Sequence, residues 1–186
     1  MRPRSSGVFA LLVFTAAAWT GASGVAVSKP AGSAAREHPI PQSLVFEHEE
    51  TFHRLSILAR RHGAVGVEAR KALALFRRHS QREREYILPP LALLPDLADG
   101  KVTPDMAWAV VMADRVKADR EQIFQEHVEV TDAMNALLVA GQRAHDNDAI
   151  EFARAAVGDS LNDSELLEPT VLLIGDYLRG KLPPRP

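Results

Sequence analysis

The chain has 186 residues, 46% hydrophobic and 25% charged, so it can form one folded domain and lacks the composition of a disordered protein. Its net charge of −2, with basic residues scattered among acidic ones, gives no electrostatic reason to expect a nucleic-acid partner. The absence of cysteine excludes disulfides, thiolate metal sites and a lipid-modified cysteine anchor, so any metal must be held by His, Asp or Glu.

The first predicted element is a secretory signal peptide, residues 1–28, with cleavage expected after Gly24 or after Ser28. Arg2 and Arg4 precede an apolar run over residues 8–19, and small residues follow it. The run is shorter than the roughly 20 residues that span a bilayer, so we expect no stable membrane anchor, an uncleaved anchor being the alternative. Residues 29–41 are predicted to be a linker. The mature protein is therefore expected to be periplasmic or secreted.

The remaining residues, 42–182, show helical periodicity and no strand-like alternation. Glycine, proline and N-cap signals divide this region into elements. The predicted helices cover about residues 43–62, 67–87, 103–141 and 146–162, with a short final helix at 171–178. Short connections between long helices favour antiparallel neighbours. The expected fold class is all-α: an up-down four-helix bundle of two repeated helical hairpins plus a short C-terminal helix.

The two hairpins carry the same pattern of residues about 80 positions apart. The first has Glu47, His48, His79, Glu83 and Pro89 in order, and the second has Glu126, His127, Asp159, Asp163 and Pro169. In both, the third member of the pattern stands 10 residues before the proline. Unrelated surface residues have no reason to fall in register twice. The repeat therefore predicts that these side chains belong to one site.

The spacing within the repeat suits metal ligands. His79 and Glu83 are four residues apart, which places them on one helix face with about 5–6 Å between Cβ atoms. Imidazole and carboxylate groups suit a first-row metal, and bundles build metal sites from facing helices. The candidate ligands are His48, His79, Glu83, His127, Asp159 and Asp163. The alternative is a set of ion pairs such as that of His79 with Glu83.

These residues make the chain resemble the hemerythrin-like cation-binding family over about residues 42–180. The resemblance rests on the two Glu-His pairs, on His79-x3-Glu83 before the prolines, and on the Gly-Asp-Tyr-Leu-Arg stretch at 175–179. It implies a four-helix bundle around a non-haem, often di-iron centre that binds oxygen or senses or stores metal. It also makes Asp132, five residues after His127, a further candidate ligand.

The chain departs from the family pattern at Asp159 and Asp163, where the family has a second His-x3-Glu. Aspartate reaches less far than imidazole, and Asp159 adds negative charge where a neutral ligand is expected. One of two metals would then be weakly held or absent. The second half of the predicted site is therefore expected to be partly degenerate.

The expected function is that of an exported hemerythrin-like metal-binding protein rather than an enzyme. Its cofactor would be iron, mononuclear or asymmetric di-iron, and its partners the metal ion and a small diatomic ligand, oxygen or nitric oxide. The main alternative is a metal-free, degenerate relative with a structural or interaction role. A di-iron oxidase is a third reading, for which the sequence offers no substrate pocket. Excess buried carboxylates would favour metal, because like charges need a cation to sit together.

Overall fold

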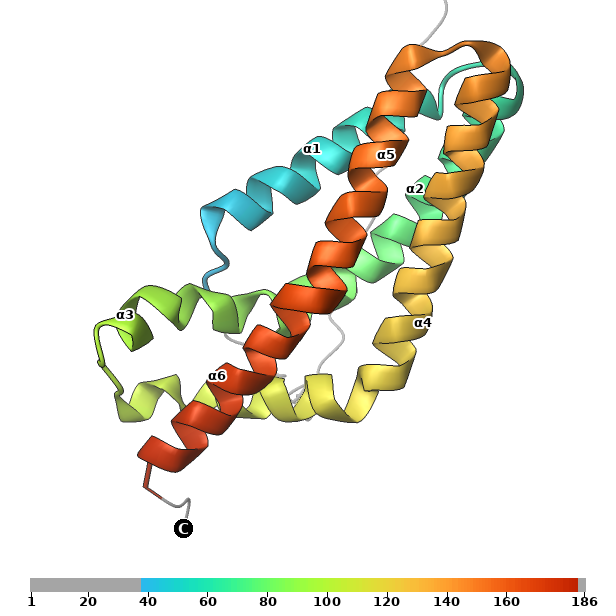
Figure 1. The fold of residues 1–186 in the computed structure, drawn as a ribbon. Helices are drawn as coiled ribbons and strands as arrows, with labels where there is room; N and C mark the ends of the chain where they lie inside the picture. Colours follow the sequence, from blue (N-terminus) through green and yellow to red (C-terminus); the bar gives the residue numbers. More distant parts are fainter. Residues whose placement is uncertain (1–37, 184–186) are drawn as a thin grey trace, which may run out of the picture. The chain divides into compact units, whose positions relative to one another are not determined.

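The computed structural model describes residues 38–183, and all of their regular structure is helical (Figure 1). The predicted all-α class is therefore confirmed for this part of the chain. The predicted signal peptide, residues 1–28, and residues 29–37 of the predicted linker lie outside the described residues. Within residues 38–183, no helix combines the length and the apolar character that a bilayer crossing requires.

The first half of the fold contains two long helices and a short one. Helix α1 covers Gln42–Leu58, and α2 covers Gly63–Arg82 and continues into a π-helical segment, Glu83–Ile87. A 3₁₀ segment, Pro89–Leu93, and the short helix α3, Leu94–Ala98, follow. The two prolines of the 3₁₀ segment cannot donate backbone hydrogen bonds, so the long helix cannot continue through them.

The second half repeats this order on a longer scale. A 3₁₀ turn, Pro104–Met106, leads into α4, Ala107–Ala144. Helix α5 covers Asn147–Asn162, a second π-helical segment covers Asp163–Leu167, and α6 covers Glu168–Lys181. The Asp146 side chain caps α5 by accepting a hydrogen bond from the amide of Ala149 at 3.2 Å.

Several predicted boundaries need correction. The first predicted helix ends at about residue 62 and the second begins at about residue 67, but α1 ends at Leu58 and α2 begins at Gly63. The φ of Gly63, +74°, is a conformation that glycine adopts without strain, so the chain can turn there. The third predicted helix begins at about residue 103, but α4 begins at Ala107, after the 3₁₀ turn. The last helix begins before Val171, because the π-helical segment carries the chain on from α5 without a break.

Helix α4 contacts three other long helices. It packs against α2, α5 and α6, and α1 packs against α2 and α5. These contacts bury two separate apolar cores. One lies among α1, α2, α5 and the later part of α4, and includes Leu55, Met134, Leu137 and Phe152. The other lies among the first π-helical segment, the earlier part of α4 and α6, and includes Tyr86, Ile123 and Leu178.

A layer of polar residues separates the two cores. Along α2, Ala72 belongs to the first core and Tyr86 to the second, with the buried His79 and Glu83 between them. Along α4, Ile123 and Val130 belong to different cores, with Glu126 and His127 between them. Three of the side chains predicted as ligands, those of His79, Glu83 and His127, therefore lie in this layer, which we call the polar layer.

Candidate metal centre

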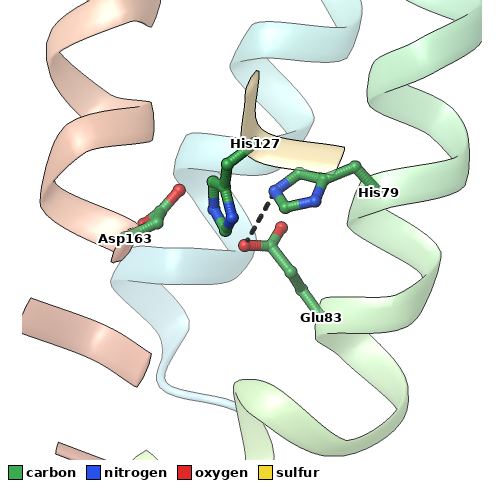
Figure 2. Close-up of side chains that lie close together, drawn as sticks. All are labelled: His79, Glu83, His127 and Asp163. Carbon is green, nitrogen blue, oxygen red and sulfur yellow. Dashed lines mark ion pairs between the residues drawn. The ribbon is translucent and has the colours of Figure 1, made fainter. Parts of the chain in front are cut away.

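Four side chains, three of them from the polar layer, converge in the interior (Figure 2). His79 comes from α2, Glu83 from the start of the first π-helical segment, His127 from α4 and Asp163 from the start of the second π-helical segment. Each offers one ligand atom, and these atoms all lie within 4.8 Å of one another. The first three residues are buried and Asp163 is partly buried. This arrangement could hold a metal ion.

The two π-helical segments lie at corresponding places in the repeat. They begin at Glu83 and Asp163, the two repeat-related carboxylates, 80 residues apart. A π-turn widens the helix locally and changes the direction of the side chains around it, and such turns are frequent at functional sites. The helices therefore change geometry at the two residues whose carboxylates belong to the converging group.

The part of the centre that comes from the first hairpin, His48, His79 and Glu83, is called the first half-site here, and Glu83 lies in its middle. Glu83 is 1% exposed, and its two oxygens lie 2.8 Å from Nε2 of His48 and 3.2 Å from Nε2 of His79. Burial alone would raise the pKa of Glu83, but the hydrogen bonds and positive charge of the two histidines lower it to about 2. Burial in turn would lower the pKa of His48 and of His79, and Glu83 raises both. Without a metal, these three groups form a charged cluster.

His48 is thus joined to the four converging side chains through Glu83. Its Nδ1 lies 2.8 Å from the carbonyl oxygen of Leu44, one helical turn earlier. That hydrogen bond keeps a proton on Nδ1 and leaves Nε2 directed at Glu83. A metal ion near Glu83 could take the place of the Nε2 proton.

His127 has the geometry of an unused ligand. Its Nδ1 donates to the carbonyl oxygen of Ile123 at 3.1 Å, and its Nε2 is buried without a hydrogen-bond partner. Burial, reinforced by the nearby charge of His79, lowers the pKa of His127 to about 4, so the ring is neutral near pH 7. A neutral imidazole with Nδ1 held by a carbonyl presents a free lone pair at Nε2, which is how histidines commonly bind metals.

The second half-site comes from the second hairpin and contains His127, Asp159 and Asp163. Its carboxylates have raised pKa values, whereas the pKa of Glu83 is lowered. Burial, with the negative charges of Glu83 and Glu47, raises the pKa of Asp163 to about 7. Asp159 is partly buried, and burial raises its pKa as well. Neither residue has a histidine partner of the kind that Glu83 has. A cation bound here would offset the repulsion between these carboxylates.

A small pocket adjoins the centre, and Asp159 lines this pocket together with His79 and Asp163. Its volume is about 20 Å³, which is room for a molecule the size of water. The lining combines polar and apolar side chains: Glu47, His48, Thr51, Phe76, His79, Val130, Met134, Ala156, Asp159, Ser160 and Asp163. All six sequence-predicted ligands therefore lie in the converging group, or line this pocket beside it.

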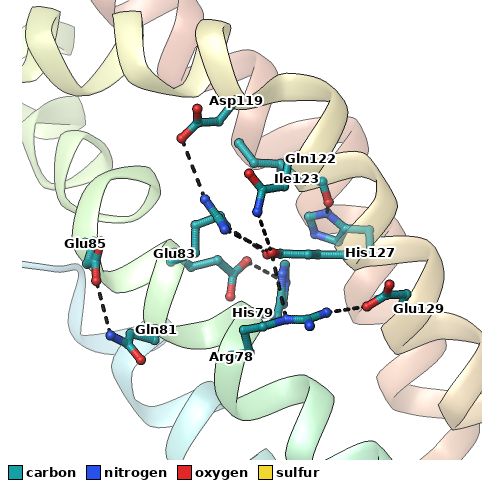
Figure 3. A network of polar contacts seen from close by, with 12 residues as sticks. Arg78, His79, Gln81, Glu83, Glu85, Asp119, Gln122, Ile123, His127 and Glu129 are labelled. Carbon is teal, nitrogen blue, oxygen red and sulfur yellow. Dashed lines mark hydrogen bonds and ion pairs between the residues drawn. The ribbon is translucent and has the colours of Figure 1, made fainter.

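The two glutamates that precede the repeated histidines have different surroundings. Glu126 accepts hydrogen bonds from Nε and Nη2 of Arg82 at 2.9 and 3.0 Å, and Arg82 also donates to Tyr86. Figure 3 shows the surrounding polar network, in which Arg78 donates to Glu129 and Gln81 donates to Glu85. Glu47 instead lines the pocket, and burial and then Asp159 raise its pKa. The chain thus neutralises Glu126 with an arginine and leaves Glu47 beside the other carboxylates.

Glu168 was missed by the sequence analysis. It is the residue before Pro169, its side chain is 12% exposed, and its Oε1 lies 3.2 Å from Nδ1 of His127. Burial raises its pKa to about 7. When the two halves are aligned on Pro89 and Pro169, Glu168 corresponds to Leu88. A carboxylate at a position that is hydrophobic in the other half could have identified Glu168 from the sequence. Asp132, the further candidate, is exposed on α4 and does not belong to the converging group.

The comparisons with known proteins do not assign this chain to a family. Searches against protein-family models, curated proteins and solved structures find no match.

Proposed function

We propose that this chain is an exported hemerythrin-like protein that binds non-haem iron. In this proposal α1–α2 and α4–α5 are the two repeated hairpins of an up-down four-helix bundle, with α6 as the additional C-terminal helix. The ion is held by His79, Glu83, His127 and Asp163, with His48 and Asp159 completing the set. The protein works in the periplasm or outside the cell, binds oxygen or nitric oxide or handles metal, and is not an enzyme.

One observation carries the proposal. Four side chains able to ligate a metal, brought from two hairpins, place ligand atoms within 4.8 Å of one another. Surface residues meet by chance more easily than buried ones, and three of these four are buried. The free Nε2 of His127 and the raised pKa of Asp163 add support, since a cation would satisfy the first and neutralise the second.

The donor atoms restrict the class of metal. Imidazole nitrogens together with carboxylate oxygens suit borderline metals such as iron, manganese, cobalt and zinc. The preference for iron within that group rests on the sequence resemblance, because zinc binds a given site more tightly than ferrous iron. The pocket beside the centre, about 20 Å³, has room for a ligand the size of water.

The direct test is elemental analysis of the protein purified from iron-supplemented medium, followed by anaerobic reconstitution with ferrous iron. We expect iron near one ion per chain, or two if the centre is di-iron, and an optical change when oxygen or nitric oxide is added. The double variant His79→Ala/His127→Ala is the matched control and should carry no iron. Wild-type protein that takes up no ferrous iron, manganese, cobalt or zinc would refute the proposal.

The second candidate function is a metal-free structural or interaction role. The observation that favours it is the pair of contacts from His48 and His79 to the two oxygens of Glu83, which compensates this carboxylate without an ion. It predicts that chelators leave the melting temperature unchanged. The metal proposal predicts a lower melting temperature after chelation, because an ion that binds only the folded state stabilises it.

A further inference from the structure

The two repeat-related histidines differ in what lies beside Nδ1. His48 has the carbonyl oxygen of Leu44 at 2.8 Å. His127 has the corresponding carbonyl, that of Ile123, at 3.1 Å, and also has Oε1 of Glu168 at 3.2 Å. The second histidine therefore has a carboxylate next to its Nδ1–H group, on the ring nitrogen that is not free to bind an ion.

Glu168 occupies a position where the first hairpin has hydrocarbon. Its repeat equivalent, Leu88, is 1% exposed and belongs to an apolar core. The Oε1 atom of Glu168 is buried and has no hydrogen-bond partner in the described part of the chain. A buried carboxylate oxygen without a partner is costly, so its presence calls for a physical reason.

The neighbouring histidine supplies that reason. The Nδ1 proton of His127 is shared between two nearby acceptors, because the carbonyl oxygen of Ile123 lies 3.1 Å and Oε1 of Glu168 lies 3.2 Å from Nδ1. An imidazole gains positive charge when its other nitrogen binds a cation, and a carboxylate beside Nδ1 stabilises that charge. Such a carboxylate also fixes the tautomer and makes the ring a stronger ligand.

We propose that Glu168 is a positioning residue that strengthens His127 as a metal ligand. This inference rests on the proposed metal site and deepens it. The second hairpin has Asp159 where the repeat predicts a histidine, so it contributes fewer imidazoles than the first. A carboxylate at residue 168 compensates by making the remaining histidine, His127, more basic and better held.

The test compares three variants in competitive chelator titrations with ferrous iron under anaerobic conditions and with cobalt. Glu168→Leu installs the residue found at position 88 and should weaken both metals by about 10–100-fold. Glu168→Gln keeps an acceptor oxygen without the charge and should show a smaller loss. Glu165→Gln changes an exposed carboxylate three residues away and should bind as wild type does.

Two further measurements separate positioning from a general effect on folding. The melting temperature of metal-free Glu168→Leu should equal or exceed that of wild type, because the substitution removes an unpaired buried carboxylate oxygen. In the cobalt-loaded protein, the shifted NMR signal of the His127 Nδ1–H proton should exchange with water faster in Glu168→Leu, whereas the His48 signal should not change.

The outcomes distinguish this inference from the proposed function. Wild-type protein that binds no metal removes both. Wild-type protein that binds metal, together with a Glu168→Leu variant that binds within about twofold of it, removes only the role of Glu168, since supporting carboxylates have larger effects. Loss of affinity accompanied by a matching loss of metal-free stability would also contradict positioning.

Discussion

The two hairpins carry one carboxylate each at the same point of the repeat, Glu83 and Asp163, but the pKa values of these carboxylates shift in opposite directions. Glu83, in the first hairpin, contacts two histidines, and its pKa is lowered to about 2. For Asp163, in the second, burial, reinforced by the negative charges of Glu83 and Glu47, raises the pKa to about 7. Both stand at the start of a π-helical segment. A repeat can therefore preserve backbone geometry while the electrostatics of its copies diverge. The first half-site is balanced without an ion, and the second is not.

The largest effect is expected from Glu83→Gln. The substitution leaves His48 and His79 in the interior without their common anion, and removing one partner of a buried ion pair typically costs about 3–5 kcal/mol. The free energy of unfolding of the metal-free protein, measured in urea, should fall by that order. Glu85→Gln, on an exposed neighbour, is the control. A loss as small as that of the control would mean that the first half-site is not balanced in this way.

Asp163→Asn should have the opposite sign. At pH 8 the substitution removes a negative charge that the fold opposes, so the free energy of unfolding of the metal-free protein should rise by about 1–2 kcal/mol. The same variant should bind metal more weakly, because it loses a carboxylate ligand. Stability and affinity would thus move in opposite directions. If both decrease at pH 8, Asp163 has a favourable partner in the metal-free state, and the contrast with Glu83 disappears.

Asp159→His introduces the histidine that the repeat predicts at this position. The variant should bind iron about tenfold more tightly, because changes at ligands and their supporting residues commonly alter metal affinity by at least that factor. Imidazole reaches further than a short carboxylate and adds no charge beside Asp163. Asp159→Ala should instead weaken binding, and the exposed His145 can be changed to Ala as a control without effect. Competitive chelator titration measures all three. Equal affinities for the three proteins would show that residue 159 does not contact the ion.

The smallest expected effect is the pH dependence of the metal-free wild type. The folded-state pKa values of His48 and His79 are raised, so their stabilising contribution is lost as the pH rises above about 6.5. Asp163 and Glu168, with pKa values raised to about 7, remain protonated longer in the folded state, which also lowers stability as the pH rises towards 7.

The free energy of unfolding should therefore fall as the pH is raised from about 6 to 8. Urea titrations across this range provide the measurement. Asp163→Asn should flatten the lower part of the curve. A free energy of unfolding that rises across the same range would contradict the charge assignments of both half-sites.

The sequence predicted the helices because their apolar positions follow the helical period. It predicted that His48, His79 and His127 lie together because they belong to the pattern that the two hairpins share, although the counterpart of His79 is Asp159. It did not predict the π-helical segments at Glu83 and Asp163, since one extra residue in a turn leaves the pattern of apolar positions nearly unchanged. The end of α4 was placed too early, at Gly141, because glycine is a frequent stop residue, whereas the helix continues to Ala144.

Glu168 and the pairing of Glu126 escaped prediction for a different reason. Glu168 has no polar counterpart in the first hairpin, so a search based on the repeat passes over it. The partner of Glu126 is Arg82, which is 44 residues away, and only the packing of α2 on α4 brings them together. Sequence spacing therefore identifies residues shared by the two halves, whereas the differences between the halves depend on tertiary contacts.

The polar layer lies between the two apolar cores, so it determines whether the two cores unfold separately or together. Each core is a contiguous apolar cluster of the kind that can open as a unit, and the layer between them contains ionisable groups. An ion ligated from both hairpins would join the two units into one. Metal binding would then make the unfolding of the two cores cooperative. In hydrogen exchange, the amide hydrogens of the two cores would exchange at different rates without the ion and at a common, slower rate with it. Resistance to proteases would follow the same change, which would let the cell distinguish the loaded protein from the empty one by its lifetime.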